Sequence, residues 1–148
     1  MKNKLIGYTT GVYDLFHIGH LRLLKKANLH CDYLIVGVSS DELVQEYKQK
    51  RPIIPLEHRL EIVNSLKFVD EVVIQTHRDK YQQFEEYGYD VLFVGDDWKG
   101  DPIWVELERK LNSKGAEVVY FPYTKSVSST KFTNILQDIY DDEKSSQS

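Results

Sequence analysis

The stretch Thr9-Thr10-Gly11-Val12-Tyr13-Asp14-Leu15-Phe16-His17-Ile18-Gly19-His20 decides how the rest of this chain is interpreted. A short apolar run at residues 5–8 precedes it and predicts a buried strand. Apolar residues at helical spacing follow at 21–27, so a helix begins near the end of the stretch. His17 and His20 are therefore expected where a strand is followed by a helix, at the carboxyl edge of a sheet.

This junction predicts an anion-binding site. Open α/β sheets bind ligands at the carboxyl ends of their strands, and a helix amino terminus offers free N–H groups and a positive dipole end. Gly19, between the two histidines, lets a phosphate approach the backbone without meeting a Cβ. The alternative is structural, with one histidine capping the helix and the other a satisfied core residue. Two of the five histidines at one junction beside Asp14 favour the binding interpretation.

Strand and helix patterns alternate along the rest of the chain. Further strands are predicted at 33–38, 69–74, 91–94 and 118–121, and helices at 44–47, 56–66, 80–87 and 102–111, with a last helix capped by Ser128 or Ser129. Five strands joined by helices predict an α/β fold, a Rossmann-like, doubly wound parallel sheet in a single domain at residues 1–140. Residues 141–148 are polar and are expected to form a disordered tail.

The composition limits the classes of function. The chain has 148 residues and a formal net charge of −4, without the basic balance typical of nucleic-acid-binding proteins, so no nucleic-acid partner is expected. No apolar run approaches membrane-spanning length, and the amino terminus does not resemble a signal peptide. The single cysteine, Cys31, cannot form an internal disulfide. A soluble, cytoplasmic protein without membrane insertion is the expectation.

Four blocks of the sequence resemble one enzyme family. Residues 11–20 resemble the HxGH signature of the nucleotidylyltransferase superfamily, and residues 67–72 resemble the R-Y-V-D-E-V of its cytidylyltransferases. Residues 95–98 match the family's G-D-D-W, and residues 124–130 resemble its R-T-E-G-I-S-T-T segment. The blocks occur in the family's order and span nearly the whole chain. Within the superfamily, the chain is most similar to bacterial glycerol-3-phosphate cytidylyltransferases.

The resemblance implies a reaction and its participants. It implies transfer of CMP from CTP, with Mg²⁺, to a phosphorylated small alcohol, giving a CDP-alcohol such as CDP-glycerol and pyrophosphate. Such products supply cell wall, capsule or lipid polymers, and similar enzymes are homodimers. The implied catalytic residues are His17 and His20, which would donate hydrogen bonds to phosphate oxygens, and Lys50. No protein ligand for the metal is assigned.

The predicted nucleotide-binding residues come from three segments. They are Thr10, Gly11, Val12, Asp14, His17, Gly19 and His20; Gly95, Asp97 and Trp98; and Tyr123, Thr124, Val127, Ser128, Ser129 and Thr130. In the second segment a carboxylate or backbone group would recognise the cytosine amino group, and Trp98 would stack or wall the pocket. The alternative there is an Asp-rich turn with a buried tryptophan. In the third segment hydroxyl and N–H groups would hold the triphosphate, although simple capping explains one serine.

Two lysines are assigned to the phosphate of the acceptor. The basic loop 48–51 suits a second anion, and the resemblance singles out Lys50, with a solvated loop as the alternative. Lys67 replaces a family arginine, which keeps the charge but loses the bidentate fork. The role of Asp14 stays open between orienting a histidine or the triphosphate and holding a turn. Arg59 is expected to be structural.

One departure from the family leaves rival functions open. Tyr123 stands where the family has an arginine, and a tyrosine cannot neutralise a phosphate, so Lys125 or Lys131 would have to supply that charge. One rival is an adenylyltransferase that uses ATP with another phosphorylated acceptor; the other is a nucleotide-binding regulator without turnover. The acceptor is also open among glycerol phosphate, other phosphorylated polyols, phosphocholine and phosphoethanolamine. No cluster of aromatics near a carboxylate is visible for a choline cage, which favours glycerol phosphate.

Overall fold

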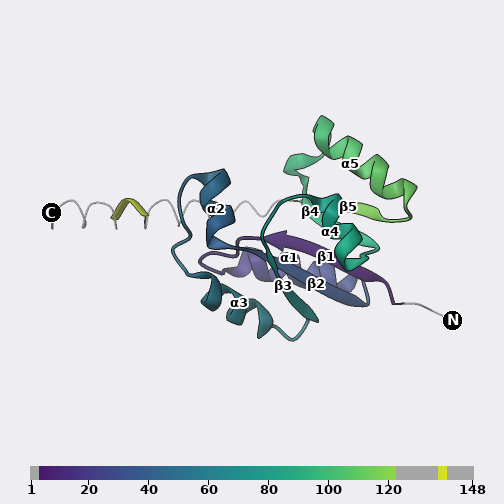
Figure 1. Cartoon of the computed structure of the whole chain (residues 1–148). Coiled ribbons are helices and arrows are strands. Elements are labelled where there is room, and N and C mark those ends of the chain that lie inside the picture. The colour runs from purple at the N-terminus through teal and green to yellow at the C-terminus, as the bar shows by residue number, and fades with distance from the viewer. Residues whose placement is uncertain (1–3, 123–136, 140–148) are drawn as a thin grey trace.

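The computed structural model describes residues 4–122 and 137–139. Strands and helices alternate along this part of the chain (Figure 1). The strands are β1 (Ile6–Gly11), β2 (Tyr33–Ser39), β3 (Glu71–Gln75), β4 (Val91–Gly95) and β5 (Glu117–Phe121). The helices are α1 (Ile18–Leu29), α2 (Asp41–Lys48), α3 (Leu56–Asn64), α4 (Lys80–Tyr87) and α5 (Pro102–Ser113), with a short 3₁₀ helix η1 (Asp96–Trp98).

All the strands pair in parallel in one 5-stranded sheet of order β3-β2-β1-β4-β5. The central strand β1 pairs with β2 along its whole length but with β4 only at Gly7–Val91 and Tyr8–Leu92. The chain moves outward from β1 to β3 and then crosses β1 to reach β4, so the connections change direction between β1 and β4. At such a point neighbouring strands leave a crevice beyond their carboxyl ends, where ligands bind.

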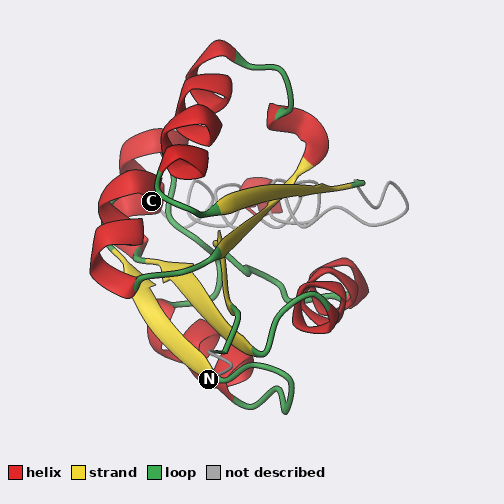
Figure 2. Ribbon diagram, turned by 90° about the vertical axis from the view of Figure 1, so that its right-hand side faces the viewer, coloured by secondary structure: helices red, strands yellow, loops and turns green. Residues whose placement is uncertain are grey.

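Each face of the sheet is covered by its own helices (Figures 1 and 2). On one face, Leu24 of α1 and Val63 of α3 pack with Val36 of β2. On the other face, Leu111 of α5 packs with Tyr8 of β1, and α4 contributes partly buried aromatic side chains. Strands covered on both faces explain the continuous apolar runs in the sequence.

Aspartates fix the amino ends of the strands. Asp32, Asp70 and Asp90 accept hydrogen bonds of 2.9, 2.8 and 2.8 Å from the backbone N–H groups of Leu5, Leu34 and Ile6, respectively. An ionised acceptor makes such bonds stronger than neutral ones. These carboxylates lie just before the strands begin, at the opposite end of the sheet from the histidines.

The predicted alternation of strands and helices and the predicted parallel sheet are confirmed, and β1 is the central strand. The helix Lys80–Tyr87 has the predicted bounds, and Gly88 closes it with a φ of 64°. The helix predicted to reach Leu66 ends at Asn64, where Ser65 caps it, and the Leu66 N–H donates to the carbonyl of Val63, three residues back instead of four. The predicted last helix and tail lie outside the described residues except at 137–139, which are helical. No helix in the described ranges is long and apolar enough to cross a membrane.

Candidate active site

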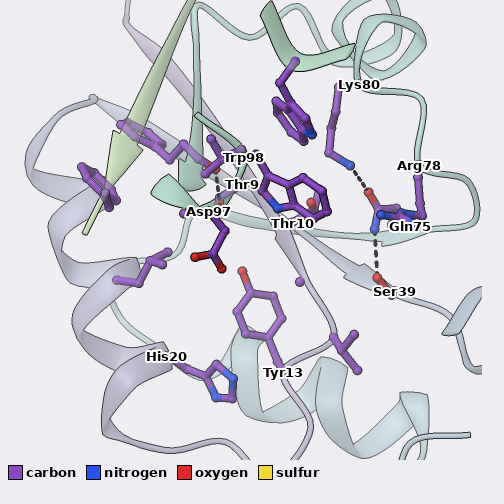
Figure 3. Close-up of a pocket in the computed structure, with 18 of the residues that line it drawn as sticks. Thr9, Thr10, Tyr13, His20, Ser39, Gln75, Arg78, Lys80, Asp97 and Trp98 are labelled. Atoms are coloured by element: carbon purple, nitrogen blue, oxygen red, sulfur yellow. Dashed lines mark hydrogen bonds between the residues drawn. The ribbon is translucent and has the colours of Figure 1, made fainter. Parts of the chain in front are cut away.

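The carboxyl ends of the strands open into a cavity of about 1110 Å³ (Figure 3). Its walls come from the loop after β1, the first turn of α1, the ends of β2, β3 and β4, η1 and the start of α5. Because β1 is central, its loop lies between a half formed by β4 and β5 and a half formed by β2 and β3. The two halves carry different polar groups.

The two histidines cap helix α1 with the same ring nitrogen. His17 Nδ1 accepts a hydrogen bond from the backbone N–H of Gly19 at 3.0 Å, and His20 Nδ1 accepts one from the N–H of His17 at 3.2 Å. The rings stack with centroids 4.0 Å apart, and both line the cavity. A ring nitrogen that accepts carries no proton, so each neutral ring has its hydrogen on Nε2. Capping therefore fixes both histidines in the tautomer that donates from Nε2.

The histidines are uncharged in the ligand-free protein at neutral pH. Burial, and then the neighbouring His17, lowers the pKa of His20 to about 4, and burial also lowers the pKa of His17. His17 Nε2 is buried, and no hydrogen-bond partner for it occurs in the part of the chain that the structure describes. A phosphate oxygen would satisfy this nitrogen, and its negative charge would raise the pKa of both rings.

A second polar group lies at the ends of β2 and β3 (Figure 3). Lys80, the first residue of α4, is only 9% exposed, and its Nζ donates to Gln75 Oε1 at 2.6 Å. Gln75 Nε2 donates in turn to Ser39 Oγ at 2.8 Å. Burial, and then the charge of Arg78, lowers the pKa of Lys80 to about 7. A buried ammonium that donates to a neutral amide beside another cation favours an anionic ligand.

Two more cationic side chains line this half of the cavity. The Arg78 guanidinium lies 4.2 Å from the ring centroid of Tyr47, and Lys48 Nζ lies 5.9 Å from the same centroid. Lys48 ends α2, and Arg78 precedes α4, so different connections bring them together. With Lys80 they form the basic half of the cavity, defined as Lys48, Arg78 and Lys80.

Both tryptophans of the chain line the cavity. The rings of Trp98 and Trp104 stack with centroids 6.0 Å apart, and Trp98 lies between Asp97 and the Gln75–Lys80 pair in Figure 3. Asp97 and Asp101 line the same space. No such group of aromatic residues and carboxylates is visible in the sequence, because only η1 and α5 together bring these separated residues to one wall.

Most of the predicted site residues that the structure describes meet at this cavity. Those that line it are Thr10, Gly11, Val12, His17, Gly19, His20, Gly95, Asp97 and Trp98. A Cβ at Gly11 would come within 2.9 Å of the Tyr13 ring, so only glycine fits there without a shift. Tyr123, Thr124, Val127, Ser128, Ser129 and Thr130 lie outside the described residues.

Three predicted residues do not line the cavity: Asp14, Lys50 and Lys67. Asp14 is 3% exposed, and its carboxylate accepts hydrogen bonds from backbone N–H groups of the segment before α3. Lys67 is exposed and precedes β3, so it lies at the amino end of the sheet, away from the cavity. In the basic loop it is Lys48, and not Lys50, that reaches the cavity wall. Arg59 does not line the cavity either: it has no exposed surface, and it donates to three backbone carbonyls and to the Asp41 carboxylate.

Sequence reasoning missed Ser39, Gln75, Arg78, Lys80 and Trp104. Arg78 and Lys80 could have been recognised from the sequence as unusual. They lie at a helix amino terminus, where cations oppose the helix dipole. A local arrangement that is unfavourable for the helix indicates a functional site.

A family model described as cytidylyltransferase-like matches residues 8–145. The chain belongs to the cytidylyltransferase-like family. The resemblance expected from the four sequence blocks is confirmed, and so is nucleotidyl transfer as the class of chemistry.

Relatives of this cytidylyltransferase-like protein include enzymes with two different named activities. Glycerol-3-phosphate cytidylyltransferase from Bacillus subtilis (strain 168) is 37% identical over 129 residues, which cover 86% of this chain and 92% of the relative. FAD synthase from Thermococcus sibiricus is 34% identical over 139 residues, which cover 93% of this chain and 94% of the relative. A solved structure of the lipopolysaccharide core biosynthesis protein from Thermoplasma volcanium has a TM-score of 0.68 at 30% identity and covers 84% of this chain and 100% of that one.

Proposed function

We propose that this protein transfers CMP from CTP to glycerol 3-phosphate and releases pyrophosphate, giving CDP-glycerol. The observation that carries the proposal is a cavity with two separate groups for anions, the Nε2 donors of His17 and His20 and the basic half. A reaction that joins two phosphates needs two such groups. The relationship to glycerol-3-phosphate cytidylyltransferase supports CTP and glycerol 3-phosphate as the pair.

The chemistry requires positioning and charge stabilisation. An oxygen of the acceptor phosphate attacks the α-phosphorus of CTP, the new P–O bond forms, and the bond to pyrophosphate breaks with its electron pair on the leaving oxygen. His17 and His20 donate hydrogen bonds from Nε2 to oxygens of the phosphorus under attack, where negative charge is concentrated. Neither imidazole forms a covalent bond.

The acceptor phosphate is assigned to Lys48, Arg78 and Lys80 in preference to Lys50 and Lys67. All three line the cavity, and the buried Lys80 is held by the neutral Gln75 amide. A bound phosphate would raise the pKa of Lys80 and keep the ammonium charged.

Mg²⁺ is proposed to enter with the triphosphate. No group of three or more His, Cys, Asp or Glu that could hold a metal ion occurs in residues 4–122 and 137–139. Mg²⁺ usually binds through one or two carboxylates, substrate phosphates and water, and Asp97 at the cavity wall is a suitable carboxylate. The bound ion would neutralise phosphate charge. By analogy with the family, the enzyme is proposed to act as a cytoplasmic homodimer.

A second candidate function is adenylyl transfer from ATP to flavin mononucleotide, the reaction that gives FAD. The stacked pair Trp98 and Trp104 favours it, because this aromatic surface suits a planar ring better than it suits glycerol. The similarity to FAD synthase supports the same candidate.

A pyrophosphate-release assay tests these functions. CTP and ATP are each incubated with Mg²⁺ and glycerol 3-phosphate, flavin mononucleotide, phosphocholine or phosphoethanolamine. Release with CTP and glycerol 3-phosphate is expected. Release only with ATP and flavin mononucleotide would select the second candidate, and CTP binding without release against any acceptor would indicate a regulator. The His17→Asn variant controls for contaminating activity.

A further inference from the structure

The segment Pro52-Ile53-Ile54-Pro55 contains only two backbone N–H groups, because proline has none. Both of these groups donate to one side chain. Ile53 N–H donates to Asp14 Oδ2 and Ile54 N–H donates to Asp14 Oδ1, each at 2.8 Å. The Asp14 carboxylate thus uses both oxygens to hold the whole segment against the loop that carries the histidines.

Arg59 ties the same two segments together from inside the protein. Its side chain has no exposed surface. Nε donates to the Ile54 carbonyl at 2.8 Å, and Nη1 donates to the carbonyls of Val12 and Ser39 at 2.8 and 2.7 Å. A buried guanidinium with three carbonyl acceptors in three segments leaves little freedom to any of them.

The backbone around Asp14 needs such support. Tyr13 and Leu15, on either side of it, have φ values of 57° and 51°. Non-glycine residues rarely adopt this left-handed region, and they persist there only when the surroundings hold them. The bonds of Asp14 and Arg59 supply that restraint.

We infer that Asp14 and Arg59 are positioning residues that fix the histidine loop relative to the segment following Lys48. This inference rests on the proposed function for the identity of the two phosphates that are brought together. His17 and His20 follow the loop that contains Asp14. Lys48, which ends α2 shortly before Pro52, lines the basic half of the cavity. Asp14 does not line the cavity, so it acts on the reaction through the geometry of its neighbours.

The consequence is a selective effect on turnover. In-line attack needs the reacting atoms at about 3–3.5 Å, and a displacement of about 1 Å costs on the order of 10²-fold in rate. Binding of CTP alone tolerates such a displacement. Weakening the Asp14 bonds should therefore lower kcat and leave CTP affinity unchanged.

Asp14→Asn is the first test. Asparagine has nearly the same size, but its Nδ2 would face a backbone N–H, so one of the two bonds is lost. The expected result is a loss of kcat on the order of 10²-fold. The dissociation constant for CTP, measured by tryptophan fluorescence, should not change. Pro52→Ala provides a second route if Asp14→Asn folds poorly, because it frees the same segment, leaves Asp14 in place and should lower kcat in the same direction.

The matched control is Asp90→Asn. Asp90 Oδ2 accepts the N–H of Ile6 at 2.8 Å, which is the same chemistry at the amino end of the sheet. This variant should lose thermal stability, as Asp14→Asn does, but keep kcat. Amide hydrogen exchange followed by NMR adds a readout independent of turnover. The Ile53 and Ile54 amides should exchange slowly in the parent protein, faster in Asp14→Asn and unchanged in Asp90→Asn.

Three outcomes would overturn the inference. A loss of CTP affinity parallel to the loss of kcat in Asp14→Asn would make Asp14 a nucleotide ligand. A lowered Tm with unchanged kcat would make it merely structural. Unchanged exchange of the Ile53 and Ile54 amides would show that the carboxylate does not hold the segment. If the parent protein released no pyrophosphate with any acceptor, the proposed function would fail, while the exchange data would still decide whether Asp14 holds the segment.

Discussion

Lys80 Nζ lies 2.6 Å from Gln75 Oε1, so the first residue of α4 reaches back over the end of β3. A lysine at this helix position opposes the helix dipole, and its burial lowers the pKa to about 7. Both effects are unfavourable for a charged side chain in the free protein. An anion bound in the cavity would offset the unfavourable helix dipole and raise the pKa of Lys80 again. Lys80 is therefore the most informative residue to mutate.

Lys80→Met should raise the KM for the acceptor by about 10- to 100-fold, as expected for loss of a hydrogen bond to a charged group. Methionine keeps much of the side-chain length and removes the charge. The KM for CTP should not change, because the nucleotide is assigned to the other half of the cavity. Steady-state kinetics with each substrate varied in turn measures both constants.

Lys114→Met, which replaces an exposed lysine at the end of α5, is the control for Lys80→Met and should leave both KM values unchanged. A large rise in the acceptor KM in Lys50→Met, with no rise in Lys80→Met, would show that Lys50 binds the acceptor phosphate, as the sequence predicts.

The acceptor KM should also depend on pH in one direction. With a pKa of about 7, Lys80 loses its proton in the free protein as the pH rises from 7 to 9. The charged form binds the phosphate, so the acceptor KM should rise over this window. The rise should be absent in Lys80→Met, and a profile that is the same in both proteins would contradict the assignment.

His17→Asn and His20→Gln separate helix capping from catalysis. Asparagine is a favourable N-cap residue, and glutamine at the third helical position completes a capping box, so helix α1 keeps its caps. Both variants lose the imidazole ring with its fixed Nε2–H donor, and the side-chain amide that replaces it uses its oxygen for the cap and does not hold its NH₂ group in the same place. Turnover should fall by about 10²- to 10³-fold, as for removal of an oxyanion donor, with Tm nearly unchanged. Full activity in both variants would remove the histidines from the mechanism.

His20 should make stability depend on pH in the acid range. The folded-state pKa is lowered from 6.5 to about 4, so the unfolded chain binds the proton more readily between these values. The free energy of unfolding should therefore fall as the pH drops from 6.5 towards 4, and this contribution should be constant above 6.5. Urea unfolding at pH 7 and pH 5 should show a larger loss for the parent protein than for His20→Gln. Equal losses would show that His20 is not buried as described.

The sequence predicted the sheet because apolar runs and helical spacing are local signals. The run at 33–38 reflects burial on both faces of β2, and Gly88 closes α4 where the pattern ends. The histidine junction was also predictable, since a strand followed directly by a helix places both rings at a sheet edge.

The basic half of the cavity was not predictable in the same way. Ser39, Gln75 and Lys80 are connected by side-chain hydrogen bonds between different elements, and in the sequence each looks like a solvated polar residue. The role of Asp14 does not follow from the sequence for the same reason, because its partners Ile53 and Ile54 belong to another segment. Such contacts follow from how strands and loops are brought together in space.

The central place of β1 separates two tasks within the molecule. The loop that follows it carries the two histidines proposed to act on the α-phosphate, whereas the groups proposed to bind the acceptor lie on the side of β2 and β3. A change of substrate, whether by natural divergence or by engineering, should thus be confined to the segments that follow β2 and β3. New specificity would then arise without rebuilding the catalytic apparatus.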